Sequence, residues 1–398
     1  MTSLRRASFV PLCAAVTAVL VLSACASGSS TTNAGGSTAG ELTIASSNPM
    51  TGDSGYYGQD KVRGIQMALE DVNNAGGVNG RKVKLVIDDD GGQPAQGASL
   101  AAKECADSNI LAVIGHWNSS VSLAAAPIYD RCKLSSINDD TTVKLSGISP
   151  YSFRVFATGE VEGKLLAKFV WEKGYRRTAI VYDTNDYGIT LNDAFSKAFK
   201  ELGGTIALSD AYVEGNKNFA PDAQKVKSSN ADSTFIAGYY VETALIAKAI
   251  RAAGISHQLF AGDGVDAPQL TQLGGGAVEG VTFADDYAPQ LQSKENQAFV
   301  AKWRAKYKAD PDTFAALAYD ATNVVIAAMK SGASDREAIQ KALKNTKNFV
   351  GVTGAITFDK QNDAARNVYM LTVKSGAITL NGEQLKDGKI VPASEIIK

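Results

Sequence analysis

The sequence has little of what metal sites and catalytic centres need. It contains two histidines, His116 and His257, and neither an HxxxH nor a CxxC pair, so it shows no spacing typical of zinc ligands. It also lacks a P-loop, a GxSxG elbow and a GxGxxG that follows a predicted strand. We therefore expect no metal, no cofactor and no catalytic residues, and we interpret His116 as a loop or packing residue.

An excess of charge of one sign is also missing. The 398 residues include 40 basic and 41 acidic side chains, for a formal net charge of -1. This balance excludes the positive surface that nucleic acids and anionic membranes attract, so we expect no nucleic-acid partner. With 45% hydrophobic and 20% charged residues the chain has globular composition, and its length exceeds one hydrophobic core. Two domains are therefore expected.

The apolar run near the start of the chain is too short to cross a bilayer comfortably, which takes about 20 residues. Phe9 to Leu22 instead has the length of a signal-peptide core, and two arginines precede it. The run ends in Leu-Ser-Ala-Cys, which resembles the lipobox of bacterial lipoproteins, in which the cysteine, here Cys25, becomes the lipidated first residue. An ordinary secretory signal with a chance cysteine is the alternative.

Residues 1–24 are thus expected to form a signal peptide and residues 25–40 a tether. Ala26 to Gly40 contains only small or polar residues, a composition typical of flexible linkers. A lipid, a tether and a globular body together predict an extracytoplasmic protein that is anchored to a membrane surface by its lipid.

After residue 41, short β-rich runs alternate with amphipathic segments, a pattern that indicates parallel sheets covered by helices on both faces. The first series predicts strands at Leu42–Ser46, Lys82–Asp88, Ile110–Gly115 and Leu134–Ile137, with helices at Asp60–Ala75, Ala95–Ser108 and Ser119–Arg131. The series restarts with helices at Glu160–Lys173, Tyr187–Leu202, from Pro221 and at Val241–Ala253, and with strands at Thr178–Tyr182, Thr205–Tyr212, Ser233–Ala237 and Leu259–Ala261. Three more helices are predicted at Lys294–Tyr307, Thr313–Lys330 and Asp335–Asn345.

Several segments carry a family resemblance through their order and spacing. They are Pro49–Gly52 with Tyr57-Gly58, Gly64–Gly80, Val113–Ser120, Ile180–Asp183 with Tyr187-Gly188, Gly238-Tyr239, Gly262–Val265 and Gly354–Asp359. Together they resemble the leucine/isoleucine/valine-binding proteins, which have the type I periplasmic binding protein fold and serve ATP-driven (ABC) importers. The match extends from residue 41 to about residue 375.

The resemblance implies an α/β fold with two doubly wound parallel-sheet lobes joined by a three-segment hinge. It places the crossovers near residues 157–160, 284–287 and 355–368, with lobe 1 formed by 41–159 plus 287–360 and lobe 2 by 160–286 plus 361–398. It also implies a monomer that delivers an amino acid or related small polar solute to ABC importer permease subunits. The alternative is a ligand-sensing receptor component that binds an amide, a polyamine or an aromatic acid, and an enzyme is the third class.

The ligand should lie off the carboxyl ends of the strands, where loops lead into helices. Ser119 opens a predicted helix whose free N–H groups suit a carboxylate, although a plain N-cap would explain it too. The resemblance adds Thr141 as a second carboxylate contact and Asp263 as the partner of a ligand ammonium; a turn aspartate is the simpler explanation of Asp263. The aromatic walls would be Tyr57, Trp117, Tyr187 and Tyr239, and Asn118 and Asp139 complete the predicted site.

The sequence departs from the family at Asp139 and Asp140, where branched-chain binders usually have small neutral residues, and at Trp117, which replaces a smaller apolar one. Consecutive side chains of an extended loop face opposite sides, so we expect one aspartate of the pair to enter the cleft. It would favour a solute with an extra donor, stacked on Trp117, over leucine, isoleucine or valine. Solvated or capping aspartates are the alternative.

Two cysteines remain for the globular body, Cys105 and Cys132, because Cys13 lies in the signal and Cys25 is expected to carry lipid. Their predicted helices should lie side by side on one sheet face, with both cysteines at the carboxyl ends. In an oxidising compartment this arrangement predicts a disulfide, and two buried free thiols are the alternative.

Overall fold

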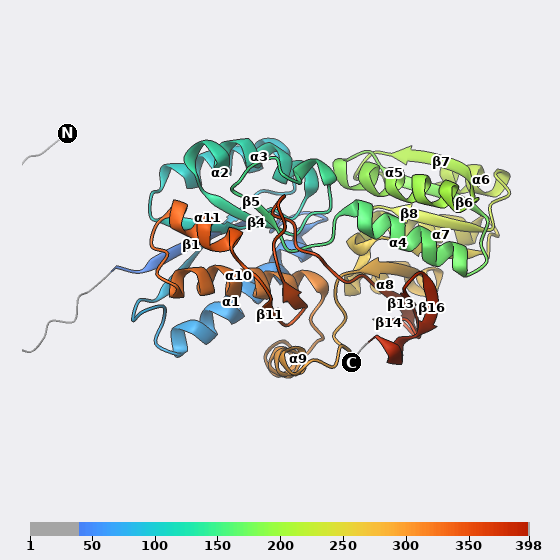
Figure 1. The fold of residues 1–398 in the computed structure, drawn as a ribbon. Coiled ribbons are helices and arrows are strands. Elements are labelled where there is room, and N and C mark those ends of the chain that lie inside the picture. Colours follow the sequence, from blue (N-terminus) through green and yellow to red (C-terminus); the bar gives the residue numbers. More distant parts are fainter. Residues whose placement is uncertain (1–39, 397–398) are drawn as a thin grey trace, which may run out of the picture. The chain divides into compact units, whose positions relative to one another are not determined.

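The computed structural model describes residues 40–396 (Figure 1). Cys25, the predicted signal peptide and nearly all of the predicted tether lie outside these residues. Within the described part of the chain, each helix is too short or too polar to qualify as a membrane span.

The first sheet has five strands, all parallel, and forms the centre of lobe 1. Of these five strands, only β5 (Ser152–Arg154) was not predicted from the sequence. Its three residues, Ser-Phe-Arg, contain a single apolar side chain and therefore show no period. The order across the sheet is β2 (Val83–Asp89), β1 (Leu42–Asn48), β3 (Ile110–Ile114), β4 (Ser135–Asn138) and β5 (Ser152–Arg154).

Helices cover both faces of this sheet, with α1 beside α10 on one face and α2 beside α3 on the other (Figure 1). Helix α1 begins at Gly55, five residues before its predicted start at Asp60, because the preceding loop packs against its first turn. A side chain at Gly58 would place its Cβ 1.9 Å from the Pro49 carbonyl oxygen, so only glycine permits this contact. The helices of lobe 1 are α1 (Gly55–Asn74), α2 (Pro94–Ala106), α3 (Ser119–Cys132), α9 (Lys294–Tyr307), α10 (Thr313–Lys330) and α11 (Arg336–Lys344).

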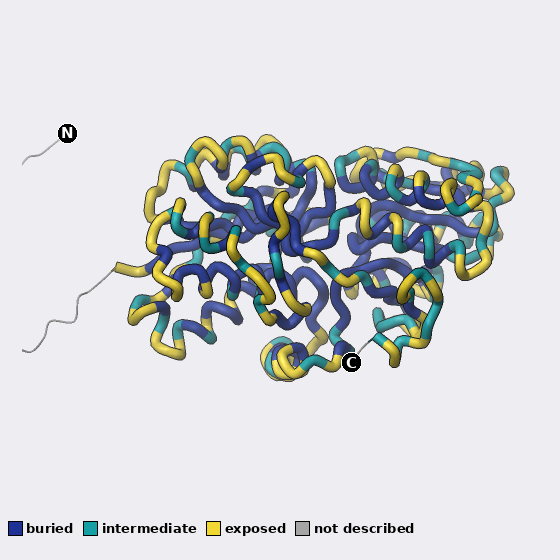
Figure 2. The backbone as a smooth tube through the Cα atoms, viewed as in Figure 1, coloured by how far each residue is buried: buried dark blue, intermediate teal, exposed yellow. Residues whose placement is uncertain are grey.

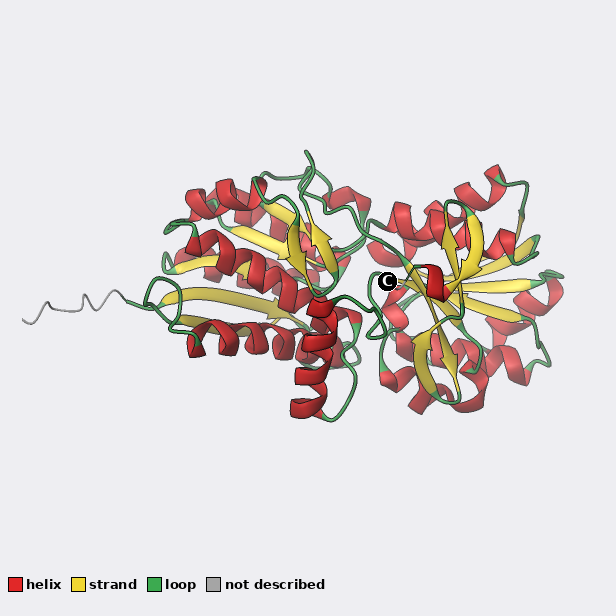
Figure 3. Ribbon diagram, turned by 60° about the horizontal axis from the view of Figure 1, so that its bottom comes forward, coloured by secondary structure: helices red, strands yellow, loops and turns green. Residues whose placement is uncertain are grey.

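The second sheet has seven strands and forms lobe 2 (Figure 3). Five are parallel, whereas β13 and β14 form an antiparallel edge that the sequence did not predict. The order is β14 (Ala377–Leu380), β13 (Tyr369–Lys374), β10 (Thr282–Asp285), β9 (Gln258–Ala261), β8 (Ser233–Ala237), β6 (Arg177–Asp183) and β7 (Thr205–Tyr212). Its helices are α4 (Gly159–Glu172), α5 (Asp186–Glu201), α6 (Ala220–Ser228), α7 (Tyr240–Ala252) and α8 (Pro268–Gly274).

The chain passes between the lobes three times, after β5, after β10 and after β12. Between the last two passages it supplies α9, α10 and α11 to lobe 1, together with the hairpin of β11 (Phe349–Gly351) and β12 (Gly354–Ile356). A second hairpin, β15 (Glu383–Lys386) with β16 (Lys389–Pro392), packs against α4 in lobe 2. The predicted fold class of two α/β lobes is confirmed; the exact lobe boundaries stay a prediction.

Buried backbone, dark blue in Figure 2, runs through the middle of both lobes. Every residue of β1, β3, β4 and β8 is buried, which is typical of parallel strands covered on both faces. These rigid strands hold the loops at their carboxyl ends in fixed positions.

Candidate functional site

Loops from the two lobes meet around a small enclosed cavity. Its free space is about 10 Å³, close to the minimum for one water molecule, so the walls have almost closed upon it. Two segments of lobe 1, after β3 and β4, and three of lobe 2, after β6, β8 and β9, supply the walls. The lining residues are Trp117, Ser119, Asp139, Asp140, Thr141, Tyr187, Tyr239 and Asp263.

Two hydroxyl groups of lobe 1 are free at this cavity. The N-cap of α3 is Asn118, whose side chain accepts from the N–H groups of Ser120 and Val121. Ser119 therefore does not serve as the N-cap, and the capping alternative for it is wrong. Its Oγ is buried and finds no partner in residues 40–396, and the same holds for Thr141 Oγ1. A helix N-terminus with two free hydroxyl donors suits a carboxylate.

Asp263 supplies a carboxylate from lobe 2. The Tyr187 hydroxyl donates to Asp263 Oδ1 at 3.0 Å, and the backbone N–H of Asp263 donates to Glu162 Oε1 at 2.9 Å. Burial raises the pKa of Asp263 to about 6. Burial, followed by repulsion from Asp263, raises the pKa of Glu162 well above its usual range. Glu162 was not predicted, because an acidic residue in the first turn of a helix is ordinary.

Both aspartates of the Asp139-Asp140 pair line the cavity, so the expectation that only one would enter is wrong. Strand β4 ends at Asn138, and the alternation of an extended strand does not continue past it. Asp139 pairs with Lys61 of α1 at 2.5 Å, and both side chains are buried. Asp140 lies 3.9 Å from Arg154, and burial raises its pKa to about 6. Sequence reasoning missed Lys61, which looks like a surface lysine of an amphipathic helix.

Two residues of the predicted site, Tyr57 and Asn118, lie outside the cavity lining. Tyr57 is fully buried and stacks on Trp117 with ring centroids 4.0 Å apart, which covers one face of the indole ring. The Tyr57 hydroxyl donates to the Gly264 carbonyl of lobe 2 at 2.5 Å, and the Asn118 amide donates to the Tyr239 hydroxyl at 3.0 Å. Tyr57 and Asn118 thus connect the two lobes and do not line the cavity.

Further contacts between the lobes surround the site. The Ser120 hydroxyl and the Lys144 ammonium of lobe 1 both reach the Asp186 carboxylate of lobe 2, at 2.7 and 2.6 Å. The Tyr240 hydroxyl donates to the Asp53 carbonyl at 2.6 Å. The structure therefore has the cleft in a closed form.

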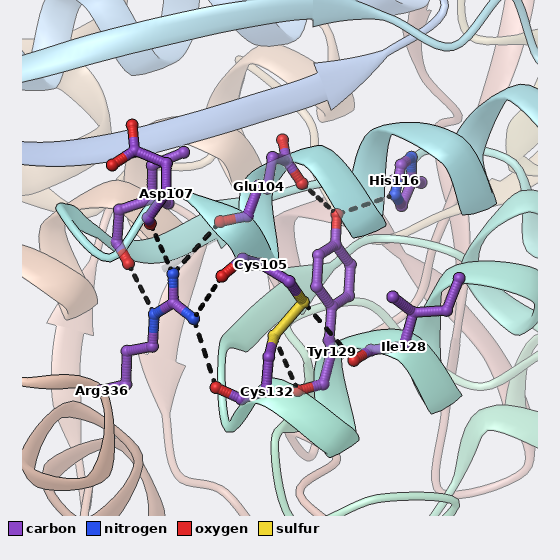
Figure 4. The surroundings of a disulfide bond; sticks show 9 residues. Glu104, Cys105, Asp107, His116, Ile128, Tyr129, Cys132 and Arg336 are labelled. Carbon is purple, nitrogen blue, oxygen red and sulfur yellow. Dashed lines mark hydrogen bonds between the residues drawn. A yellow bond between two sulfur atoms is a disulfide. The ribbon is translucent and has the colours of Figure 1, made fainter.

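His116 belongs to lobe 1 and is not among the residues that line the cavity; Figure 4 shows it beside Tyr129. It is buried, with Nδ1 2.6 Å from Asp90 Oδ2 and Nε2 3.1 Å from the Tyr129 hydroxyl. Figure 4 also shows Cys105 and Cys132 joined at the adjacent ends of α2 and α3, with Cα atoms 5.7 Å apart. This spacing lies within the range for a disulfide.

An enclosed polar cavity between two α/β lobes defines a two-lobed binding protein. In agreement, residues 41–377 match the profile of a family described as periplasmic binding protein. The chain belongs to this family, and the resemblance to leucine/isoleucine/valine-binding proteins is confirmed.

Known relatives match over most of their length. The Leu/Ile/Val-binding protein homolog 1 of Brucella melitensis is 29% identical over 345 residues, which cover 85% of this chain and 91% of that protein. The leucine-, isoleucine-, valine-, threonine- and alanine-binding protein of Pseudomonas aeruginosa is 29% identical over 326 residues, 81% of this chain and 87% of the relative.

Solved structures share the fold. The leucine binding protein LivK of Thermotoga maritima is 31% identical, with a TM-score of 0.81 and coverage of 89% of this chain and 100% of that one. The LivJ protein of Streptococcus pneumoniae, in complex with isoleucine, is 27% identical, with a TM-score of 0.82 and coverage of 88% of this chain and 99% of that one. A benzoate-bound protein of R. palustris, 21% identical with a TM-score of 0.80, shows the fold alone.

Proposed function

We propose that this chain is the extracytoplasmic solute-binding component of an ABC importer and that it carries an amino acid or a related small polar solute. The observation that carries the proposal is the set of buried polar atoms around the cavity that find no partner within residues 40–396. They are the hydroxyls of Ser119 and Thr141, Asp139 Oδ2 and both carboxylate oxygens of Asp140. Buried polar groups without partners are costly, so a solute that pairs with them is favoured.

The arrangement complements a zwitterion. Ser119 and Thr141 offer donors to a carboxylate from lobe 1, and Asp263 offers an acceptor to an ammonium from lobe 2. A solute held at both ends touches both lobes and therefore stabilises the closed form. Relatives whose names include leucine, isoleucine and valine support an amino acid as the class of solute.

The two aspartates of lobe 1 favour a solute with more donors than leucine has. Asp139 Oδ2 and both carboxylate oxygens of Asp140 accept no hydrogen bond within residues 40–396, although Asp139 pairs with Lys61 and Asp140 lies 3.9 Å from Arg154. A hydroxyl, an amide or a second amine on the solute would satisfy these acceptors. We therefore expect plain branched-chain amino acids not to be the tightest ligands. A receptor component that senses an amide, a polyamine or an aromatic acid is the second candidate.

A thermal-shift screen of the purified protein tests the function, because a bound solute raises the melting temperature in proportion to RT ln(1 + [L]/Kd). The panel should contain amino acids, amides, polyamines and aromatic acids, with calorimetry for each solute that gives a shift. The proposal predicts that an amino acid with a polar or cationic side chain binds most tightly. No shift with any amino acid would refute it, and leucine binding tenfold tighter than every other solute would refute the role of the two aspartates.

The proposal includes a lipid on Cys25, a monomeric protein and permease subunits as partners. The Leu-Ser-Ala-Cys sequence supports the lipid, and the family's periplasmic description supports the extracytoplasmic location. Metabolic labelling with a radioactive fatty acid should label the protein and should fail for Cys25→Ser. Labelling of that variant would place the lipid elsewhere.

A further inference from the structure

A second and larger cavity lies between α1 and α9 of lobe 1 and α8 and the β13–β14 hairpin of lobe 2. Its free space is about 470 Å³, within the range of small-molecule sites and far above that of the cavity at Ser119. The two cavities share no lining residue. The walls contain four carboxylates, from Asp60, Asp266, Asp310 and Asp312, and one guanidinium, from Arg63.

Three of these carboxylates are buried, and one of them keeps a free oxygen. Asp312 is 6% exposed, and it caps α10 by accepting from the Ala315 N–H at Oδ1. Its second oxygen, Oδ2, is buried and has no hydrogen-bond donor in the described part of the chain. Burial, followed by repulsion from Asp60 and Asp266, raises the pKa of Asp312. Asp312 thus forms no salt bridge within residues 40–396.

The neighbouring carboxylates are only partly compensated. Asp60 is 2% exposed and pairs with Arg63 at 2.5 Å, while Asp266, 6% exposed, accepts one hydrogen bond, from the Thr313 N–H at 2.9 Å. Asp310, at the exposed rim, pairs with Arg304. The lining thus brings three buried carboxyl groups together with one guanidinium, that of Arg63.

The remaining walls are aromatic and apolar. Tyr56, Trp303 and Tyr307 line the cavity, and the rings of Trp303 and Tyr307 lie 4.4 Å apart. Arg63 and Lys306 already lie over the Tyr307 ring, 5.7 and 5.3 Å from its centroid. Aromatic faces attract organic cations, most strongly when water is excluded. Moreover, no three acidic, histidine or cysteine side chains of residues 40–396 are arranged to hold a metal ion. Carboxyl groups beside an aromatic wall, without a metal-ligand cluster among residues 40–396, favour an organic amine over a metal ion as the bound cation.

We propose that this cavity is a second binding site and that it takes a small organic ammonium ion, with Asp312 and Asp60 as its anionic partners and the aromatic side chains as its wall. The site shares no lining residue with the proposed amino-acid site. A proton shared between Asp60 and Asp312 is the competing way to compensate the same charge.

Calorimetric titration with 1,4-diaminobutane tests the proposal. The titration uses the S119A/D263N double variant, so that binding at the amino-acid site does not contribute. We expect saturable binding at constant ionic strength and at least a tenfold loss of affinity when Asp312→Asn is added. Asparagine is also a good N-cap, so this change should preserve α10. Asp335→Asn is the matched control, because Asp335 caps α11 in the same way and lies outside the cavity lining; it should leave the affinity unchanged.

Tryptophan fluorescence distinguishes which of the two cavities binds the amine. The chain has three tryptophans, of which Trp303 lines this cavity and Trp117 the other. Diaminobutane should change the emission of the protein, and Trp303→Phe should remove that change. If Asp312→Asn fails to fold, Asp60→Asn must show the same loss of affinity. Absence of saturable binding up to 10 mM, or equal affinity in the folded aspartate variant, would overturn the proposal in favour of the shared proton.

Discussion

Asp263 of lobe 2 lies at the same cavity as Ser119 and Thr141 of lobe 1. Its position after a strand of lobe 2, together with the family resemblance, predicted this place. Glu162 and Lys61 were not predicted, because an acidic first-turn residue and a helical lysine are usually exposed. Their burial follows from contacts between segments far apart in the chain, which no local pattern encodes.

Replacing Asp263 by asparagine should weaken binding of the solute by roughly 1–3 kcal/mol, the scale of a charge-assisted hydrogen bond. The asparagine can still accept from the Tyr187 hydroxyl, so the fold of the loop should persist. Calorimetry with the best solute of the thermal-shift screen measures the effect. An unchanged affinity in a folded variant would remove Asp263 from the site.

Stability should fall as pH rises through the range in which the buried carboxyl groups ionise. The pKa of Asp263 and of Asp140 is about 6 in the folded protein, above the usual value of about 3.9. The folded state therefore binds more protons than the unfolded state between about pH 4 and pH 6, and the free energy of unfolding decreases over this interval. Urea denaturation of the solute-free protein at several pH values checks this, and Asp263→Asn should reduce the slope. Stability that rises with pH over this interval in wild type, or an unchanged slope in the variant, would contradict the expectation.

At the scale of elements, the periodic helices and most buried strands were predicted closely, whereas β5, β10 and the β13–β14 edge were not. Two predicted helices match the observed ones at both ends, α9 (Lys294–Tyr307) and α10 (Thr313–Lys330). Capping residues and amphipathic periods mark these helices in the sequence. Short strands such as Ser152–Arg154 depend on pairing with a neighbour, here β4, and carry little signal of their own.

The bridge between α2 and α3 should stabilise lobe 1. A link across 27 residues lowers the entropy of the unfolded chain, worth about 3–4 kcal/mol in the chain-entropy estimate. Arg336 also donates to the carbonyl oxygens of both Cys105 and Cys132, so some of the arrangement survives without the bridge (Figure 4). The double variant Cys105→Ser, Cys132→Ser should therefore unfold at lower denaturant concentration. Two free thiols in the mature wild-type protein, counted by mass spectrometry after alkylation, would show that the bridge does not form.

At the scale of the whole molecule, the two lobes and their order along the chain followed from the alternation of strands and helices and from the resemblance. The closed state of the cleft could not be predicted in this way, because closure depends on side chains such as Tyr57 that reach from one lobe to the other. A tyrosine in a loop gives no indication of which lobe its hydroxyl will reach.

The central claim is that a solute held by Ser119 and Thr141 of one lobe and Asp263 of the other stabilises the closed form. Small-angle X-ray scattering with and without the best solute of the thermal-shift screen tests it most directly. A saturating solute should reduce the radius of gyration and bring the profile toward that calculated from the closed structure, and S119A/D263N should not respond at the same concentration. Identical profiles of the wild-type protein with and without the solute would contradict the claim.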